Sequence, residues 1–129
     1  MPFTDVHEAD WYYQAVQAAY FYELIKGFND GTFSPTERIT REQAMVIIDK
    51  AMELTGLDAT LDELNPETVL LSYSDANRVS DWALESAASC IQANLFSGRS
   101  DAVLAPGEYI TRAEVAVLMQ RLLQKSEFI

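Results

Sequence analysis

Apolar residues recur at three- and four-residue intervals in two stretches of the chain, which is the spacing of one face of an α-helix. The first stretch contains Trp11, Ala15, Ala18, Ala19, Tyr22 and Ile25. The second contains Ala44, Ile47, Ile48, Ala51 and Leu54. Gly27 and Gly56 follow these stretches, where a glycine in the left-handed conformation often ends a helix. The pattern predicts helices from Trp11 to Gly27 and from about Arg41 to Gly56, separated by a turn-rich loop.

A second copy of this arrangement follows 71 residues later. The matching pairs are Trp11 and Trp82, Gly27 and Gly98, Asp30 and Asp101, and Pro35 and Pro106. At the same offset, Ile39–Arg41 repeats as Ile110–Arg112, and Phe3–Asp5 matches Tyr73–Asp75 after a slip of one residue. So many uncommon residue types in register establish an internal repeat, and each copy reads as a helix–loop–helix unit.

The repeat predicts an all-α fold in which tandem helix–loop–helix units pack as a helical bundle. We assign repeat 1 to residues 1–56, a connector to 57–72 and repeat 2 to 73–125. The connector carries scattered leucines and is too apolar for a free linker, so we expect it to be ordered, with a short helix around Leu61–Leu64. In repeat 2 we expect a cap at Asp81, a helix end at Gly98, and a second helix lined by Val115, Leu118, Met119 and Leu122.

The second helix of each copy begins with a capping-box pattern, in which a threonine and a residue three positions later satisfy each other's backbone N–H groups. The pairs are Thr40 with Gln43 and Thr111 with Glu114. Capping does not explain Arg41 and Arg112, which fall in the first helical turn, where the helix dipole disfavours a cation. Each arginine either pairs with a nearby carboxylate or receives an external carboxylate or phosphate through its planar fork of N–H donors.

Trp11 and Trp82 open the first helix of each copy. A large aromatic residue at helical spacing is by default part of the core. The alternative role is a flat surface on which a sugar ring stacks, beside or within the packing of the core. The sequence alone leaves both roles open.

The overall charge restricts the partners of the protein. Its 129 residues include 20 acidic and 9 basic side chains, which give a net charge of −11. This charge opposes binding to nucleic acid and to anionic membranes. No apolar run is long enough to insert into a bilayer. The segment Met1–Asp5 lacks the basic and apolar character of a signal sequence, which leaves a cytosolic protein or a piece of a longer secreted chain.

The residues that commonly carry catalysis or bind metals are few. Cys90 is the only cysteine, so no disulfide forms within the chain, and we expect it to be a small core residue. We expect no catalytic or metal-binding role for His7. A calcium-binding EF-hand loop around Gly31 is excluded, because Lys26 and Phe28 would stand at its first and third ligand positions. We therefore expect no metal, no cofactor and no enzymatic activity.

Together these motifs resemble the S-layer homology family, and the resemblance covers nearly the whole chain outside the connector. The family repeat has an aromatic-x-Asp start, a tryptophan, a glycine after the first helix, an Asp-Gly-x-Phe-x-Pro loop and Ile-Thr-Arg-Ala-Glu at the second helix. The first copy reads Phe3-Thr4-Asp5, Trp11, Gly27, Asp30-Gly31-Thr32-Phe33-Ser34-Pro35 and Ile39-Thr40-Arg41-Glu42-Gln43. The second reads Tyr73-Ser74-Asp75, Trp82, Gly98, Asp101, Pro106 and Ile110-Thr111-Arg112-Ala113-Glu114.

The resemblance implies a non-catalytic anchor that acts outside the bacterial cell and binds an acidic, often pyruvylated, secondary cell-wall polysaccharide. In the family, the motif arginine faces the acidic group in a groove between adjacent repeats. This implies the same role for Arg112 and Arg41. The predicted polymer-binding set is Arg41, Arg112, Trp11, Trp82, Thr40, Thr111, Gly27, Gly98, Asp30 and Asp101.

The sequence departs from the family pattern in three ways. Gln43 stands where the family has glutamate, and Ala102–Leu104 replaces Gly-x-Phe. The family usually presents three repeats around a pseudo-threefold axis, whereas two are visible here. Either a third repeat lies outside this fragment, or chains self-associate to complete a three-repeat bundle. The alternative function is a protein–protein interaction or assembly module of a surface-layer or extracellular protein, and an enzyme is the weakest hypothesis.

Overall fold

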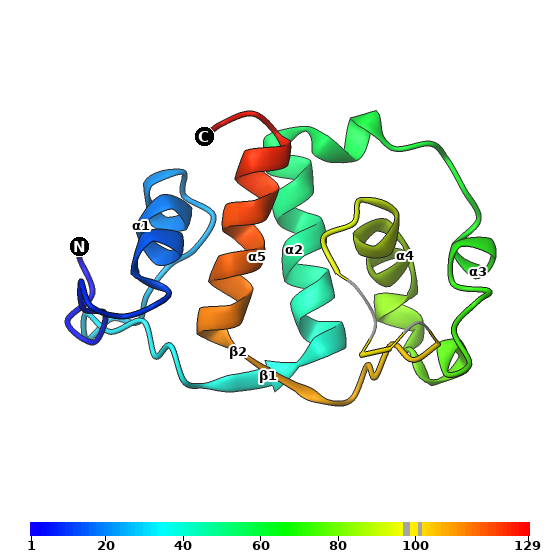
Figure 1. Ribbon diagram of the computed structural model, residues 1–129, viewed down its shortest axis with the longest axis horizontal. Coiled ribbons are helices and arrows are strands. Elements are labelled where there is room, and N and C mark those ends of the chain that lie inside the picture. Colours follow the sequence, from blue (N-terminus) through cyan, green and yellow to red (C-terminus); the bar gives the residue numbers. More distant parts are fainter. Residues whose placement is uncertain (97–98, 101) are drawn as a thin grey trace.

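A computed structural model of the chain describes residues 1–96, 99–100 and 102–129, and its regular structure is mainly helical (Figure 1). The helices are α1 (Tyr13–Phe21), α2 (Arg41–Thr55), α3 (Pro66–Val69), α4 (Leu84–Gln92) and α5 (Arg112–Lys125). Short 3-10 turns cover Leu57–Thr60, Ala76–Arg78 and Asp81–Ala83. The strands β1 (Arg38–Thr40) and β2 (Tyr109–Thr111) directly precede α2 and α5. The predicted all-α fold is confirmed.

Each repeat packs its first helix against the second helix of the other repeat. α1 lies on α5, and α4 lies on α2, while α2 and α5 run side by side through the centre of the molecule (Figure 1). An amphipathic helix is stabilised mainly by the burial of its apolar face rather than by its own propensity. Because the main cover of each central helix comes from the opposite repeat, the two repeats share one interlocked core.

A short antiparallel ladder between β1 and β2 joins the repeats at one end of the central helices. Its central pair is Ile39 with Ile110, which are equivalent residues in the two copies. The flanking hydrogen bonds are also equivalent, since Arg41 N donates to Glu108 O at 2.8 Å and Arg112 N donates to Glu37 O at 2.9 Å. The repeats are therefore related by a pseudo-twofold axis that passes through the ladder.

Both predicted capping boxes are present. Thr40 Oγ1 accepts from Gln43 N at 3.2 Å, and Gln43 Oε1 accepts from Thr40 N at 2.9 Å. The matching distances for Thr111 and Glu114 are 3.2 and 3.1 Å. The boxes satisfy N–H groups that have no partner inside the helix, so α2 and α5 begin directly after the ladder.

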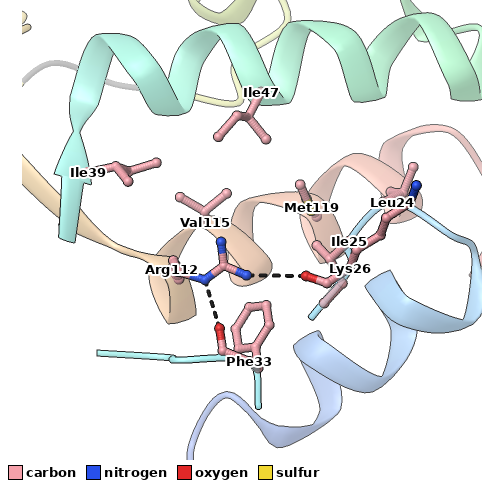
Figure 2. Close-up of a pocket in the computed structure, with 9 residues that line it drawn as sticks. All are labelled: Leu24, Ile25, Lys26, Phe33, Ile39, Ile47, Arg112, Val115 and Met119. Carbon is pink, nitrogen blue, oxygen red and sulfur yellow. Dashed lines mark hydrogen bonds between the residues drawn. The ribbon is translucent and has the colours of Figure 1, made fainter. Parts of the chain in front are cut away.

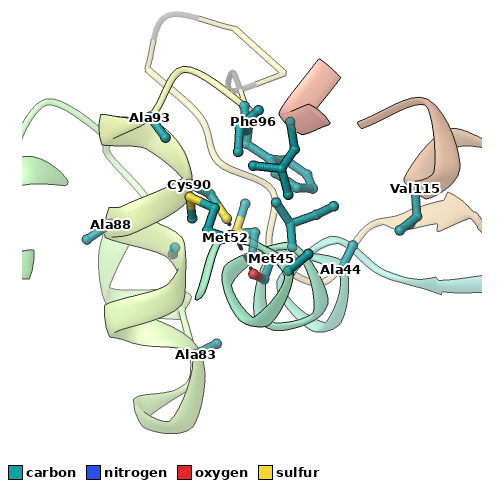
Figure 3. Close-up of a cluster of buried hydrophobic side chains, with 14 of the residues drawn as sticks. Ala44, Met45, Met52, Ala83, Ala88, Cys90, Ala93, Phe96 and Val115 are labelled. Atoms are coloured by element: carbon teal, nitrogen blue, oxygen red, sulfur yellow. Dashed lines mark hydrogen bonds between the residues drawn. The ribbon is translucent and has the colours of Figure 1, made fainter. Parts of the chain in front are cut away.

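The core lies mainly between α2 and α4, where Met45, Met52 and Cys90 face one another (Figure 3). Cys90 is fully buried, as expected for a core cysteine, and its Sγ lies 3.3 Å from the backbone oxygen of Met45. Burial raises the pKa of the Cys90 thiol, because the apolar surroundings disfavour the thiolate. This thiol is therefore an unreactive packing group.

An aspartate at the start of each repeat fixes the loop that precedes the ladder. Asp5 accepts hydrogen bonds from the backbone N–H groups of Phe33 and Ser34, at 2.8 Å each. Asp75 does the same for Leu104 and Ala105, at 2.8 and 2.9 Å. These bonds hold two non-glycine residues with positive φ, Ser34 and Ala105. Such a backbone conformation is costly and persists only when surrounding contacts impose it.

Acid is expected to weaken the fold through Asp75. Burial alone would raise the pKa of this carboxyl, but the hydrogen bonds from Leu104 and Ala105 outweigh it and hold the pKa below its ordinary value. A folded-state pKa below the unfolded one contributes stability that is present above pH about 4 and is lost as the pH falls further. Urea unfolding at several pH values should show this loss in the wild type and a flatter profile in Asp75→Asn. An unchanged slope in Asp75→Asn, equal to that of the exposed control Asp62→Asn, would contradict the assignment.

The first helix of each repeat is shorter than the sequence predicts. α1 begins after Trp11 and ends at Phe21, where Glu23 takes the positive φ that was assigned to Gly27. Gly27 is required for a different reason, since a Cβ atom there would clash with the Phe3 ring and lie only 2.6 Å from the backbone oxygen of Thr32. Gly56, by contrast, ends α2 in the left-handed conformation as predicted.

Two other local predictions are corrected, and a third falls on a residue outside the described part of the chain. Asp81 is not a helix cap, because it opens the 3-10 turn that leads into α4 and makes no capping bond. The connector does contain a short helix, but it is α3 at Pro66–Val69 rather than Leu61–Leu64, which lies between α3 and the 3-10 turn Leu57–Thr60. Gly98 lies outside the described residues, and α4 already ends at Gln92.

Within the described part of the chain, no helix has the length and hydrophobicity of a bilayer span.

Candidate functional site

Two clefts in pseudo-equivalent positions lie where the repeats meet. The first, the Arg112 cleft, has a volume of about 180 Å³ and is lined by Leu24, Ile25, Lys26, Phe33, Ile39, Ile47, Arg112, Val115 and Met119 (Figure 2). Its walls come from both repeats, and apart from Lys26 and Arg112 they are apolar. A small, largely apolar hollow with one or two cations is suited to a small ligand that carries an anionic group.

The second, the Arg41 cleft, is larger, at about 350 Å³. It is lined by Trp11, Arg41, Leu95, Phe96, Ile110, Glu114, Val117, Leu118 and Arg121. Leu95, Phe96, Ile110, Leu118 and Arg41 occupy the positions that Leu24, Ile25, Ile39, Ile47 and Arg112 occupy in the first cleft. The two clefts are therefore two versions of one site, repeated by the pseudo-twofold axis.

Arg112 is held from one side, while one nitrogen remains open. Its Nε donates to the backbone oxygen of Phe33 at 2.8 Å, and its Nη2 donates to that of Lys26 at 3.3 Å. The guanidinium lies over the rings of Phe33 and Phe28, at 4.6 and 5.0 Å from their centroids. Figure 2 shows the third nitrogen, Nη1, without a dashed line and on the side of the guanidinium that faces Val115 and Met119.

Solvent reaches this third nitrogen. Nη1 of Arg112 makes no hydrogen bond within the described residues, and no buried side-chain nitrogen or oxygen among them lacks a partner. No described carboxylate lies within ion-pair distance of Arg112 either. Burial lowers the pKa of Arg112, with Glu37 and Asp5 opposing the shift, but an arginine stays charged at neutral pH. A charged donor is thus presented to the cleft.

Arg41 is more deeply buried, with 6% of its surface exposed. Its Nε donates to the backbone oxygen of Leu104 at 2.9 Å, and its guanidinium lies 5.4 Å from the ring of Phe96. Burial lowers the pKa of Arg41, and the nearby charge of Arg99 adds to this effect. Each motif arginine therefore binds a backbone carbonyl of the opposite repeat, a contact that neither sequence interpretation included.

The clefts concentrate positive charge on an acidic protein. Lys26 and Arg112 line one cleft, and Arg41 and Arg121 line the other, so four of the nine basic residues of the chain gather there. Glu114 also lines the Arg41 cleft and offsets part of this charge, while Arg99, near Arg41 but outside the lining, pairs with Glu108 at 3.5 Å. Opposite charges attract strongly only over short distances in salt, so local cations can hold an acid group despite the net negative charge.

The two tryptophans are exposed rather than buried, which corrects the default expectation. Trp11 is 70% exposed and Trp82 is 62% exposed. Trp11 lines the Arg41 cleft, whereas Trp82 lines neither arginine cleft. Trp82 borders a hollow with Asp49, Asp81 and Glu85 instead. The structure brings Trp11 and Arg41 together and separates Trp82 from both arginines.

The remaining predicted site residues stand outside the clefts. Thr40 and Thr111 cap their helices, and Gly27 is packed against Phe3. Asp30 accepts from the Thr32 side chain and backbone, at 2.7 and 3.1 Å, and these bonds lower the pKa of its carboxyl. Gly98 and Asp101 lie outside the described residues. The polymer-binding role of these residues stays a prediction.

Sequence reasoning missed the other polar residues that line the clefts. Lys26 and Arg121 line the clefts but fall outside every motif of the repeat. Comparison of the two copies therefore did not single them out. Arg121 and Lys50 are equivalent residues at offset 71, but only Arg121 lines a cleft. For Arg121 the only available signal was its place in the same predicted helix as Arg112, and for Lys26 the sequence offered no signal.

Fold and site together define a small helical module, in which two interlocked repeats form two arginine-lined clefts where they meet. Residues 2–45 and 72–116 match the family model described as S-layer homology domain, one match for each repeat. The chain belongs to the S-layer homology domain family. Among the described residues, no cluster of histidine, cysteine, aspartate or glutamate could hold a metal ion.

Similar proteins are much longer than this chain. It is 35% identical over 126 residues, or 96% of its length, to an amylopullulanase of Thermoanaerobacterium thermosulfurigenes and to exoglucanase XynX of Acetivibrio thermocellus. The chain spans only 6% and 11% of those proteins. It is 34% identical over 102 residues to a cellulosome-anchoring protein of Acetivibrio thermocellus, which covers 79% of the chain and 21% of that protein. The family and these relatives support a cell-surface anchoring module.

Proposed function

We propose that the chain anchors a larger protein to the outside of a bacterial cell by binding an acidic cell-wall polysaccharide in its two arginine clefts. The supporting observation is that two largely apolar clefts are each lined by one motif arginine. The guanidinium of each arginine is held by a backbone oxygen of the opposite repeat. A carboxylate, such as that of a pyruvylated sugar, would complete the hydrogen bonds of Arg112 Nη1. We assign the same acid-binding role to Arg41, with Trp11 as the stacking surface of its cleft.

Two weak sites on one chain bind a repeating polymer better than either site alone. Each charge-assisted hydrogen bond contributes about 1.5–3 kcal/mol, which is a modest affinity for a single sugar. A polymer held at one cleft presents its next acid groups to the other at high effective concentration. Anchoring by many weak contacts therefore suits this molecule. Self-association to complete a three-repeat bundle stays a prediction.

The experiment that tests the proposal is sedimentation with purified, protein-free cell walls of the bacterium that carries the chain. Arg41 and Arg112 also join the repeats, so their substitution would affect folding and binding at once. Arg121→Gln removes an exposed charge from the Arg41 cleft, and we expect it to weaken wall binding by about threefold. Lys50→Gln removes the same charge at the equivalent position outside the clefts and should leave binding unchanged.

The outcomes separate the two candidate functions. Equal losses for Arg121→Gln and Lys50→Gln would mean that the overall charge, and not the cleft, determines binding. If the wild-type protein does not sediment with protein-free walls, the polysaccharide proposal fails. The alternative, a protein-interaction module of the cell surface, would then be favoured.

A further inference from the structure

A second hollow adjoins the Arg112 cleft. It has a volume of about 700 Å³, and its lining includes Gln17, Tyr20, Phe21, Glu23, Ile25 and Lys26. Ile25 and Lys26 line the Arg112 cleft as well. Figure 2 shows both residues at the end of that cleft beside α1. The two hollows therefore adjoin at Ile25 and Lys26, between Arg112 and the end of α1, and we call them together the α1 groove.

The α1 groove carries aromatic side chains that the fold leaves uncovered. Phe21 is 75% exposed and Tyr20 is 44% exposed. Each ring has an aromatic contact on one side, since Tyr20 packs edge-on against Phe3 at 5.3 Å and Phe21 packs edge-on against Tyr22 at 5.0 Å. An aromatic side chain has few rotatable bonds, so it loses little conformational freedom when a ligand stacks on its exposed face.

The pseudo-twofold axis shows that the corresponding face of the other repeat is covered. Gln92 on α4 is the equivalent of Phe21, and its side-chain amide donates to the backbone oxygen of Asp62 at 2.7 Å. The connector thus lies over this end of α4, and α3 packs on the same helix. Among the described residues, no connector lies over the equivalent end of α1. Phe21 stands there in place of the polar Gln92.

We propose that the α1 groove binds a run of the polysaccharide chain rather than a single sugar. An acidic sugar lies at Arg112, and a neighbouring sugar stacks on Phe21 and Tyr20, with Lys26 between them. The polar groups of Gln17, Glu23 and Lys26 around the aromatic rings provide hydrogen-bond partners for sugar hydroxyls. Because the larger hollow shares Ile25 and Lys26 with the cationic cleft, a polymer held at Arg112 is favoured as its occupant over a protein partner. This inference rests on the proposed function.

The test compares anionic oligosaccharides of one and three repeating units, prepared by partial hydrolysis of purified wall polysaccharide. We expect wild type to bind the longer fragment about tenfold more tightly by isothermal titration calorimetry. Phe21→Ala should reduce this advantage to about threefold and leave the affinity for the single unit unchanged. Leu54→Ala is the matched control, because Leu54 is 72% exposed and lines neither cleft nor the α1 groove.

Each other result overturns the inference in a distinguishable way. If wild type binds both fragments and Phe21→Ala changes neither affinity, or both equally, the α1 groove does not hold a neighbouring sugar, while the proposed function stands. If Leu54→Ala weakens the longer fragment as much as Phe21→Ala, the effect is not local to the groove. If wild type binds neither fragment, the proposed function itself fails. Because Phe21 is mostly exposed, unfolding curves of the variant should overlay those of wild type.

Discussion

Arg41→Ala is expected to lower the free energy of unfolding by about 3 kcal/mol, because it removes a buried bond between the repeats. The Arg41 side chain is 6% exposed and donates from Nε to the backbone oxygen of the fully buried Leu104. An unpaired buried carbonyl costs about 1–3 kcal/mol, and loss of the packed aliphatic stem adds to that cost. Alanine also leaves Phe96 without the guanidinium that lies 5.4 Å from its ring centroid.

Urea unfolding followed by circular dichroism measures this effect, and the chain supplies its own comparisons. Arg112→Ala removes the equivalent bond from a half-buried position, so we expect a loss of about 2 kcal/mol. Arg38→Ala removes an exposed arginine that lies over the Tyr109 ring, and its effect should stay within about 0.5 kcal/mol. A loss for Arg41→Ala no larger than that for Arg38→Ala would show that Arg41 does not join the repeats.

The elements that local rules govern were predictable from the sequence. The capping boxes of Thr40 and Thr111 depend on residues three positions apart, so their pattern is visible in one turn of chain. Gly56 ends α2 because only glycine takes positive φ at little cost. The repeat supported these predictions a second time, since the motifs of both helices appear in each copy at the same offset. The family assignment follows from these local signals.

The pairing of the repeats was not predictable, because it depends on contacts between residues far apart in the chain. Spacing indicates that α1 and α2 each have an apolar face, but it does not say which helix covers which. The ladder between Ile39 and Ile110 joins strands of three residues each, too short to give an alternating pattern. The interlocked arrangement is therefore a result of tertiary packing alone.

The arginines show the same limit at the site. Their position in the first turn of a helix correctly indicated a role beyond helix formation. The bonded partners, however, are backbone oxygens of Leu104 and Phe33, and a backbone carbonyl carries no signature in the sequence. For Arg112, the structure places one side of the guanidinium against the other repeat and leaves Nη1 toward the cleft, so structural and binding roles are not exclusive.

The tryptophans show why helical spacing alone misassigns exposure. Trp11 and Ala15 are separated by one helical turn, but α1 begins at Tyr13, so Trp11 precedes the helix and is not directed by it. Its side chain lies edge-on against Tyr12, with ring centroids 5.1 Å apart, and remains open to solvent. A large exposed indole beside Arg41 and Arg121 is a natural stacking surface for a charged sugar.

Trp11→Ala is accordingly expected to weaken binding to protein-free cell walls by about thirtyfold. A sugar ring stacked on the indole covers apolar surface worth roughly 2 kcal/mol, and 1.4 kcal/mol corresponds to about a tenfold change in affinity. The indole is 70% exposed, so its removal should change the unfolding midpoint little. The measurement is the concentration of walls that retains half of the protein in a sedimentation assay.

Trp82→Ala is the matched control, since it removes the equivalent and similarly exposed tryptophan of the other repeat. Trp82 borders Asp49, Asp81 and Glu85, and these carboxylates repel an anionic polymer, so we expect its loss to change affinity by less than about twofold. Equal losses for the two variants would mean that both tryptophans bind the wall and that the arginine clefts do not select the sugar. If Trp11→Ala retained wild-type affinity, Trp11 would not be the stacking surface of the Arg41 cleft, and the role proposed for this cleft would lose its aromatic contact.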